Sequence, residues 1–451
     1  MSSPASLVAF RYGCGLPLTQ GAPTTPDAML AALQGPDEMA RRFPVMSYDW
    51  VHERTSEIAQ NKKAAKTDPD LLARQKTVDE ELKREGFRAL RATIARSIDA
   101  PDALRERLLA FWADHFTVSS GAQARSIASY AFVEDAVRPH LSGQFGDMLS
   151  AVVHHPVMLL YLDQTRSVGP NSAKAKRRGG GLNENLAREL LELHTMGVGA
   201  GYSQTDVRQL AELLTGLTYD ARRGYAFQPN LAEPGPEEVL GKSYEGKGEA
   251  PIRAFLAELA RHPDTARHIS RKLAVHFLSD APDDSMVAAM AETWQRTGGS
   301  LIEVYGTMLR HEAAFAGSAA KARQPWDFVV AALKGLGLTG ETVMNWPRER
   351  LVEVVLAPLR AMGQSWKNPP GPDGWPEDIE SWITPQGLAE RIGWAMRWPA
   401  ELVDPLPHPK ALAETVLADR ASAATLWAVV RAETVAEGVG IVFASPEFNR
   451  R

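Results

Sequence analysis

The spacing of apolar residues constrains the fold of this chain most strongly. From Thr25 onward they recur at the three- and four-residue spacing of amphipathic helices, and the alternation typical of strands is almost absent. Aromatic residues set among Gly and Pro, which favour short strands and turns, are confined to residues 217–247. The sequence therefore predicts an all-α protein, a multi-helix globular array with a small β-hairpin insert near 217–247.

No linker or change of composition divides the chain into parts. By length alone, 451 residues would suggest two or three domains. Apolar residues make up 44%, which is enough to bury one large core. We therefore expect a single large helical domain over residues 1–451. The β insert and a Pro- and Trp-rich loop at residues 366–382 are its two irregular features.

A glycine-rich approach leads into a helix within residues 179–195. Asn183 is a residue type that caps helices, and it stands just before the first helical turn. At 100° per residue, Asn185, Glu189 and Glu192 fall within about 60° of one another, and a leucine stripe lies about 100° away. These three polar side chains should either line a cleft together or be exposed together.

The acidic face of this helix has two interpretations. Charged helix faces are usually solvated, and Arg188 can pair with Glu192 one turn further on. Alternatively, Glu189, Glu192 and Asn185 are catalytic side chains that transfer protons to and from a substrate. A divalent metal could also be held there, by Glu189 and Glu192 together with Asp163.

The histidines have both structural and catalytic interpretations. His115 lies on an apolar stripe with Trp112 and Phe116, where a buried, hydrogen-bonded histidine is common, but it is also a candidate catalytic residue. His155 and His262 each precede a proline, where a side chain can cap the helix that begins there. We assign the remaining leucine-flanked histidines, His194 and His276, to structural roles.

The most polar stretch of the chain is the expected loop at residues 164–182. Lys176, Arg177 and Arg178 precede three glycines and Asn183. Cations, free backbone amides and a helix N-terminus together can bind an anion. The alternative is a flexible surface loop, because glycine runs often confer flexibility.

The 366–382 loop combines rigidity with aromatic surface. Its paired prolines exclude a helix interior, and Trp366, Trp375 and Trp382 lie within it. Such a loop can serve as a recognition platform for sugars or peptides, or as a rigid lid packed on the core.

Composition excludes several classes of protein. A net charge of −5 gives no electrostatic basis for nucleic-acid binding. No apolar run approaches the roughly 18 residues of a membrane span, and the single Cys14 excludes a disulfide framework. The common catalytic signatures are absent. The first residues lack the basic and apolar regions of a signal peptide, which predicts a cytoplasmic location.

Several longer motifs occur in a fixed order along the chain. They are Ala9–Gly13, Phe111–Phe116, His155–Asp163, Gly179–Thr195, Gly197–Val207, His262–Arg267, Pro369–Pro370, Gly374–Pro376 and Ser445–Phe448. In this combination the chain resembles the domain-of-unknown-function 1800 family, which is uncharacterised and mainly bacterial.

The resemblance implies a partner, because family members are often encoded beside proteins similar to exported sulfatases or alkaline phosphatases. We therefore expect an accessory helical protein, which such a partner could carry to the periplasm by co-export. The alternative is a metal-assisted, hydrolase-like enzyme with a carboxylate-rich site around Glu189 and Glu192. The resemblance also implies a histidine where this chain has Ala232, so a metal site that used it would lack one ligand here.

Overall fold

A computed structural model describes residues 4–60, 67–119, 126–316 and 321–451. It is mainly helical, and its strands form two small antiparallel sheets of two strands each. The predicted fold class is therefore confirmed, including the position of the β insert.

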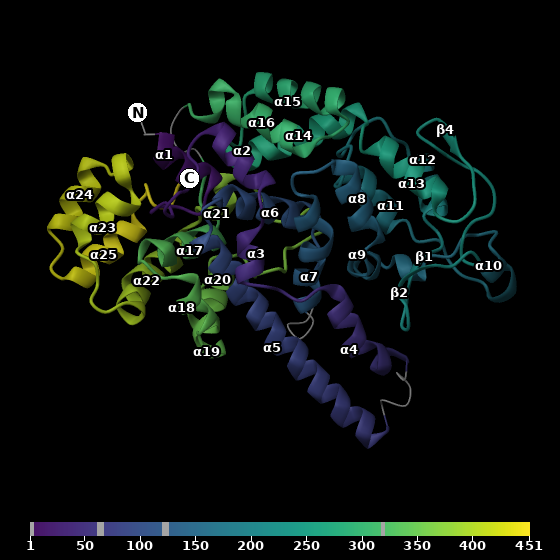
Figure 1. Ribbon diagram of the computed structural model, residues 1–451, viewed down its shortest axis with the longest axis horizontal. Coiled ribbons are helices and arrows are strands. Elements are labelled where there is room, and N and C mark those ends of the chain that lie inside the picture. The colour runs from purple at the N-terminus through teal and green to yellow at the C-terminus, as the bar shows by residue number, and fades with distance from the viewer. Residues whose placement is uncertain (1–3, 61–66, 120–125, 317–320) are drawn as a thin grey trace.

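The first part of the chain builds helices in the middle of the body and a projecting arm (Figure 1). Its elements are α1 (Pro4–Leu7), η1 (Val8–Tyr12), α2 (Pro26–Gln34), α3 (Glu38–Arg42), α4 (Tyr48–Gln60), α5 (Pro69–Asp99), α6 (Ala103–His115), α7 (Ser126–Phe132), η4 (Val133–Val137) and η5 (Arg138–His140). The Thr25 side chain caps α2 ahead of Pro26 in its first turn.

The middle of the chain carries both small sheets. Its elements are α8 (Phe145–His154), α9 (Pro156–Tyr161), η6 (Gln164–Arg166), α10 (Ala173–Arg178), α11 (Asn185–Glu192), α12 (Gln204–Leu213), β1 (Leu217–Asp220), β2 (Gly224–Phe227), β3 (Glu237–Val239), β4 (Lys242–Tyr244), α13 (Ala250–Leu259), α14 (Pro263–Phe277), α15 (Asp284–Thr297), α16 (Leu301–Arg310) and η7 (Glu312–Ala314). β1 pairs with β2, and β3 pairs with β4.

The last part is helical again on both sides of the 366–382 loop. Its elements are α17 (Pro325–Gly335), α18 (Gly340–Met344), α19 (Arg348–Leu351), η8 (Val352–Leu356), α20 (Ala357–Ala361), α21 (Ile379–Trp382), α22 (Pro385–Leu402), α23 (Pro409–Val416), η9 (Ala418–Arg420), α24 (Ala423–Val430) and α25 (Val435–Ala444).

The helices are arranged around a central region in which distant segments meet (Figure 1). α14, α15 and α16 pack on one another along one edge, and α22 to α25 form a group at one end. α4 and α5 project from the body as an arm. With 31 residues, α5 is about 46 Å long, and only its second half is buried along most of its surface.

Buried apolar side chains form two main clusters. One is built largely from α2, α6, α8 and the helices from α11 to α16. The other joins α5 and α7 to α17 and the C-terminal helices. Val157 on α9 packs against both clusters, so the two cores adjoin. The expectation of one domain over the whole chain stays a prediction.

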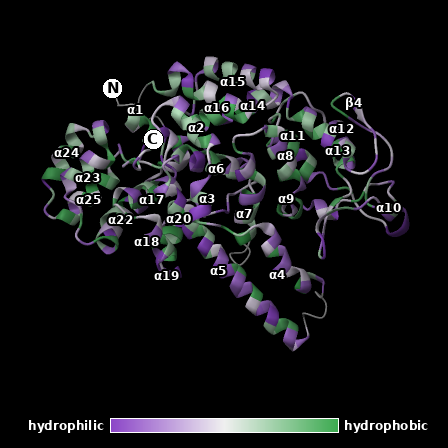
Figure 2. Ribbon diagram, viewed as in Figure 1, coloured by the Kyte–Doolittle hydropathy of each residue, from purple (hydrophilic) through white to green (hydrophobic). Residues whose placement is uncertain are grey.

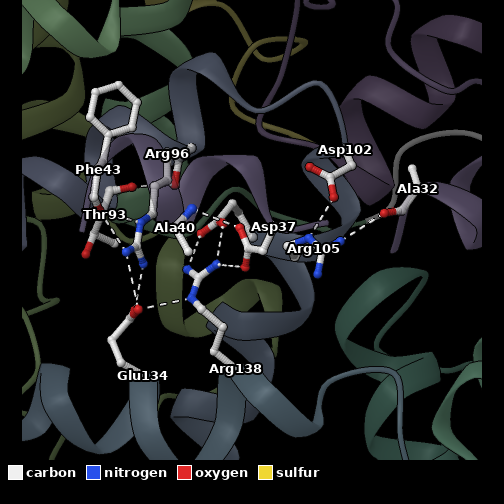
Figure 3. A network of polar contacts seen from close by, with 12 residues as sticks. Ala32, Asp37, Ala40, Phe43, Thr93, Arg96, Asp102, Arg105, Glu134 and Arg138 are labelled. Carbon is white, nitrogen blue, oxygen red and sulfur yellow. Dashed lines mark hydrogen bonds and ion pairs between the residues drawn. The ribbon is translucent and has the colours of Figure 1, made fainter. Parts of the chain in front are cut away.

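A buried network of ion pairs fastens α3, α5, α6 and η4 to one another (Figure 3). Arg96 bonds Glu134 at 2.6 Å and the carbonyl oxygen of Phe43 at 2.7 Å. Arg138 bonds Asp37 at 2.7 Å and Glu106 at 3.0 Å. Each guanidinium thus donates hydrogen bonds to carboxylate or carbonyl oxygens. These bonds offset the desolvation cost of burying its charge.

The expectation of a loop throughout residues 164–182 is wrong in part. Lys176, Arg177 and Arg178 lie on a short helix, α10, which Figure 2 shows as strongly hydrophilic. The Ser172 hydroxyl caps this helix by accepting the N–H of Ala175. Ala, Lys and Arg are strong helix formers, so a single cap suffices to start the turn.

None of the helices in the described ranges has both the length and the apolar character that crossing a lipid bilayer requires.

Candidate functional site

Residues 366–382, here called the strap, cross the body and are anchored on it at several points. The Trp366 ring stacks on Trp326 with 3.7 Å between ring centroids, and its indole N–H donates to the Tyr130 hydroxyl at 2.7 Å. Further along, Asn368 accepts a hydrogen bond from Ser119 at 2.9 Å. The strap is therefore packed on the core, as a lid would be.

The middle of the strap is fastened to α6 by Asp114. Both carboxylate oxygens of Asp114 accept the backbone N–H of Trp375, each at 3.1 Å. Gly374 approaches so closely that a Cβ on it would lie 2.7 Å from Asp114 Oδ2, and its φ of +85° favours glycine. This approach places the adjoining strap residue, Asp373, beside α6.

Glu377 anchors the far end of the strap in a buried ion-pair network. Its carboxylate meets His276 Nδ1 at 2.5 Å and Lys321 Nζ at 3.1 Å. His276 Nε2 faces Arg107 at 3.3 Å, and since a guanidinium can only donate, the His276 proton is on Nδ1. Burial alone would raise the pKa of Glu377, but its interactions with His276 and Lys321 lower this pKa to about 2.

Lys272 on α14 lies among the carboxylates of Asp114, Glu377 and Asp373, which all act on its charge. Burial lowers the pKa of the Lys272 amine, although these carboxylates oppose that change. Burial also raises the pKa of Asp114 to about 7, and the charges of Glu377 and Asp373 add to the rise. Both groups can therefore exchange protons closer to neutral pH than ordinary Lys and Asp side chains.

Three histidines have lowered pKa values to which the charge of Lys272 contributes. Burial, with the charge of Lys272 as a second cause, lowers the pKa of His115, of His194 to about 3, and of His268 to about 4. His115 Nε2 donates to the carbonyl oxygen of His194 at 3.2 Å. Since its proton is used there, His115 Nδ1 is left as an acceptor with no hydrogen-bond partner among the described residues.

The three polar side chains on the acidic face of α11 differ in their exposure to solvent. Asn185 is exposed in the first turn, whereas Glu189 and Glu192 are partly covered. The expectation that all three would share one degree of exposure is therefore wrong, because α11 starts at an exposed approach and runs beneath neighbouring elements. Arg188 bonds Glu192 at 3.2 Å and also reaches Glu184, so the predicted pair of Arg188 with Glu192 is present.

Glu189 differs from Glu192 in having no such partner. Burial raises the pKa of the Glu189 carboxyl, Glu192 and Asp373 raise it further, and Arg188 opposes them. Asp373 is thus close enough to repel Glu189 although the two residues belong to α11 and the strap. The same two carboxylates also act on Tyr161 of α9, whose pKa is raised first by burial and then by Glu189 and Asp373.

Tyr161 connects these groups to a cavity of about 590 Å³. The cavity lies between the α4–α5 arm, α7, α9 and β1, and most of its lining is apolar. Ser119, which bonds the strap residue Asn368, also lines it. The cavity therefore adjoins the strap, and its volume is within the range of small-molecule sites.

Unsatisfied polar groups distinguish this site from the network of Figure 3. Within the described part of the chain, the side chains of Lys272, Glu189, Asp373 and Tyr161 make no hydrogen bond or ion pair. Three of these side chains are half-buried and Asp373 is exposed, so all four are available to a ligand that approaches from solvent. We define the candidate site as these four side chains together with Asp114.

The other predicted site residues lie around this center with defined partners. Asp163 pairs with Arg166 at 3.3 Å. Asn183 Oδ1 accepts the N–H of Asn185 at 2.8 Å, and its side-chain amide donates to the carbonyl oxygen of Asp163 at 3.2 Å. Asn183 thus braces the approach to α11, but the predicted cap is wrong, because the N-cap position is Glu184, one residue later, and it makes no side-chain cap hydrogen bond. The predicted caps by His155 and His262 are confirmed, since each accepts the N–H two residues ahead at 3.2 Å.

The anion and metal sites stay predictions. Lys176, Arg177 and Arg178 are exposed at the C-terminal end of α10, where the helix dipole is negative rather than positive. In the described ranges, no group of three or more His, Cys, Asp or Glu side chains is placed to hold a metal ion.

Sequence reasoning missed Lys272, Asp114, Asp373 and Tyr161 as site residues. Two signals were available. Asp114 is a carboxylate inside the aromatic motif Phe111–Phe116, where burial makes a charge costly. Asp373 lies in the rigid Pro- and Trp-rich loop, which can hold a side chain in a fixed position. Neither signal indicates that Lys272 lies between them.

Comparison with known proteins places the chain in a family. No curated protein and no solved structure matches it. A family model described as "Protein of unknown function (DUF1800)" matches residues 21–450, nearly the whole chain, and includes all five residues of the candidate site. The order of motifs noted in the sequence agrees with this match, and the protein therefore belongs to the DUF1800 family of proteins of unknown function.

Proposed function

We propose that the protein is a hydrolase-like enzyme that uses Lys272 for general acid–base catalysis beside the apolar cavity. One observation carries the proposal: four polar side chains from α9, α11, α14 and the strap converge without partners in the described structure. Convergent titratable groups with shifted pKa values beside a cavity are the usual features of an active site.

In the proposed reaction, the neutral amine of Lys272 takes a proton from a water molecule as the water oxygen bonds to the substrate's electrophilic center. The resulting ammonium then returns that proton to the leaving group as the scissile bond breaks. Asp114, whose charge raises the pKa of Lys272, stabilises the ammonium between the two steps. Glu189 and Asp373 hold and orient the substrate at the entrance.

A divalent metal at Glu189, Glu192 and Asp163 remains part of the proposal as a variant. Of these three, Glu189 has no partner in the described structure, whereas Glu192 pairs with Arg188 and Asp163 with Arg166. A metal would have to displace two arginine contacts. Activity before and after dialysis against a chelator, with Mg²⁺ and Mn²⁺ added back, tests this variant.

The proposal is tested by assaying chromogenic carboxylic, phosphate and sulfate esters and an anilide with the purified protein. We expect Lys272→Met to lower kcat at least about 100-fold on any substrate that is cleaved. Glu189→Gln should raise KM more than it lowers kcat. Glu184→Gln, at the N-cap of the same helix but paired with Arg188 and Gln204, is the matched control. Equal activity of Lys272→Met and the wild type would overturn the proposal.

A second candidate function is that of an accessory protein for a sulfatase- or phosphatase-like partner, with export in its company. The observation that favours it is an apolar face on α24, where Trp427 and Val430 are each 61% exposed. Large exposed apolar side chains grouped on one helix often mark protein contacts. Co-purification with the co-expressed partner should succeed for the wild type and fail for Trp427→Ser. Fractionation of the same cells tests co-export.

A further inference from the structure

Three buried arginines line a second cavity, far smaller than the first. Arg107 on α6, Arg323 just before α17, and Arg451 all contribute to its lining, and they are 4%, 2% and 2% exposed. The motif Ala9–Gly13 also reaches this cavity, which has a volume of about 20 Å³. Distant segments of the chain therefore meet around a small space with a strongly basic lining.

The carboxylates of this lining already have cationic partners. Asp327 pairs with Arg107, and its other oxygen lies 3.3 Å from Arg451 Nε. Glu106 accepts hydrogen bonds from Arg138 through both of its oxygens, at 3.0 and 3.1 Å. Neither carboxylate is therefore left to balance a further positive charge.

Arg323 is the cation of this lining that has no counterion. It forms no ion pair with a described residue, and its Nη1 has no hydrogen-bond partner there. Its guanidinium carbon lies 4.4 Å from the centre of the Phe448 ring, a contact that leaves the N–H donors unused. The guanidinium reaches the cavity wall at Gly15, where a Cβ would lie 3.4 Å from Arg323 Nη2. Side-chain nitrogens of Arg107 and Arg451 also lack hydrogen-bond partners in the described structure.

The surroundings of Arg323 are positive. Burial lowers the pKa of the Arg323 guanidinium to about 9, the charges of Arg420, Arg107 and Arg391 lower it further, and Asp327 opposes them. A bound water could accept hydrogen bonds from these donors but could not offset their charge. An anion does both, and so removes the cost of burying an unpaired cation.

We propose that this cavity is a structural binding site for a small monovalent anion of the chloride class, held by the guanidinium of Arg323 with further donors from Arg107 and Arg451. A water molecule needs about 10–15 Å³ by the same measure, so the cavity admits a single monatomic ion and excludes a tetrahedral oxyanion. The ion neutralises the junction of the motif Ala9–Gly13 with α6 and α17. This inference goes beyond the proposed function and does not rest on it.

Binding is tested by thermal melts in sodium chloride, bromide, sulfate and gluconate at equal ionic strength. We expect chloride and bromide to raise the Tm along a saturable curve, by at least about 2 °C at a hundredfold excess over the Kd. Gluconate and sulfate should give no saturable rise. Crystals grown in bromide should show an anomalous peak in the cavity, at hydrogen-bond distance from Arg323. Equal responses to chloride and gluconate, or a bromide peak without a saturable change in Tm, would overturn the inference.

Variants of Arg323 identify the group that holds the ion. Arg323→Met keeps an apolar stem against Phe448 but removes the charge, so its Tm should not depend on chloride. In gluconate this variant should melt no lower than the wild type, because the unpaired charge is gone. Arg420→Met is the matched control, since Arg420 also lies over an aromatic ring, 4.2 Å from the centre of Phe10, but does not line the cavity.

The control variant should keep the full chloride response. If Arg323→Met does not fold, Arg323→Lys serves, because its ammonium lacks the planar fork of donors and should need at least tenfold more chloride for half of the effect. An undiminished chloride response in either variant of Arg323 would contradict the proposed site. Loss of cleavage of the chromogenic substrates, by contrast, would leave it unaffected.

Discussion

Asp114 on α6 holds Trp375 on the strap through both carboxylate oxygens, each 3.1 Å from the Trp375 backbone nitrogen. The two residues are 261 positions apart in the sequence. Because the strap is irregular around this point, the contact with Asp114 fixes where Asp373 stands relative to Lys272. A single side chain thus connects the packing of α6 to the assembly of the candidate site.

Gly374→Ala should displace the strap. The new Cβ would lie 2.7 Å from Asp114 Oδ2, and a φ of +85° strains any residue with a Cβ. We expect a lower Tm and a cost of about 1–2 kcal/mol or more in the free energy of unfolding. The control is Gly393→Ala on α22, which has no neighbour within 4 Å and should stabilise the helix by about 0.5–1 kcal/mol.

Glu377→Gln should destabilise the protein by up to about 3–5 kcal/mol, because it removes the carboxylate shared by the buried Lys321 and Arg451 and leaves Lys321 with Asp280 alone. Chemical denaturation at pH 7 measures this change. Glu380→Gln, an exposed residue on α21, should have no effect. A cost below about 1 kcal/mol would show that other groups neutralise Lys321 without Glu377.

The same carboxyl makes stability depend on pH. The pKa of Glu377 is lowered from 4.5 to about 2 in the folded protein, so its contribution is present above pH 4.5. It is lost as the pH falls from 4.5 toward 2, where the folded carboxyl also gains its proton. The free energy of unfolding, measured by denaturation across this pH range, should change less with pH for Glu377→Gln than for the wild type. An equal pH dependence in the two proteins would argue against the lowered pKa of Glu377.

Leu190→Ala and Glu189→Gln, on adjacent residues of α11, should separate packing from function. Leu190 is fully buried, so truncation leaves a cavity and should cost about 2–5 kcal/mol. Glu189→Gln keeps the size of the side chain and removes a charge that has no partner in the described structure, so the Tm should not fall. A large loss of stability in Glu189→Gln would indicate a structural role for this carboxylate.

Asp206→Ala should cost more stability than Ser203→Ala. The two residues form the capping box of α12, in which Ser203 is worth about 0.5–2 kcal/mol. Asp206 also accepts the N–H of Leu240 at 2.7 Å and so holds the β3–β4 turn against α12. Thermal melts of both variants and of the double variant measure the difference. Equal costs would mean that the bond to Leu240 contributes nothing.

Local features were largely readable from the sequence. The cap by Thr25 with Pro26, the capping box at Ser203 and the histidine caps before proline all involve residues two or three apart. The side chain needed for each of these caps is present within the same turn. The same locality explains why helical periodicity was sufficient to predict the fold class.

The candidate site was predictable only in part. Glu189 was singled out because helical spacing places it on an acidic face, and it does belong to the proposed site. Asp114, Lys272 and Asp373 come from three distant segments, and no spacing rule connects them. α10 was also missed, because its helix depends on one capping hydroxyl in a stretch that otherwise favours a loop.

The sequence by itself determined the helices, their caps and the place of the β insert, because these depend on interactions within a few residues. Only the tertiary structure decided which charges are paired and which are left available. Arg188 pairs with Glu192 and not with Glu189, and Asp114 on α6 holds the backbone of Trp375 on the distant strap. Electrostatic environment depends on what surrounds a group in space, and that is set by the packing of the whole chain.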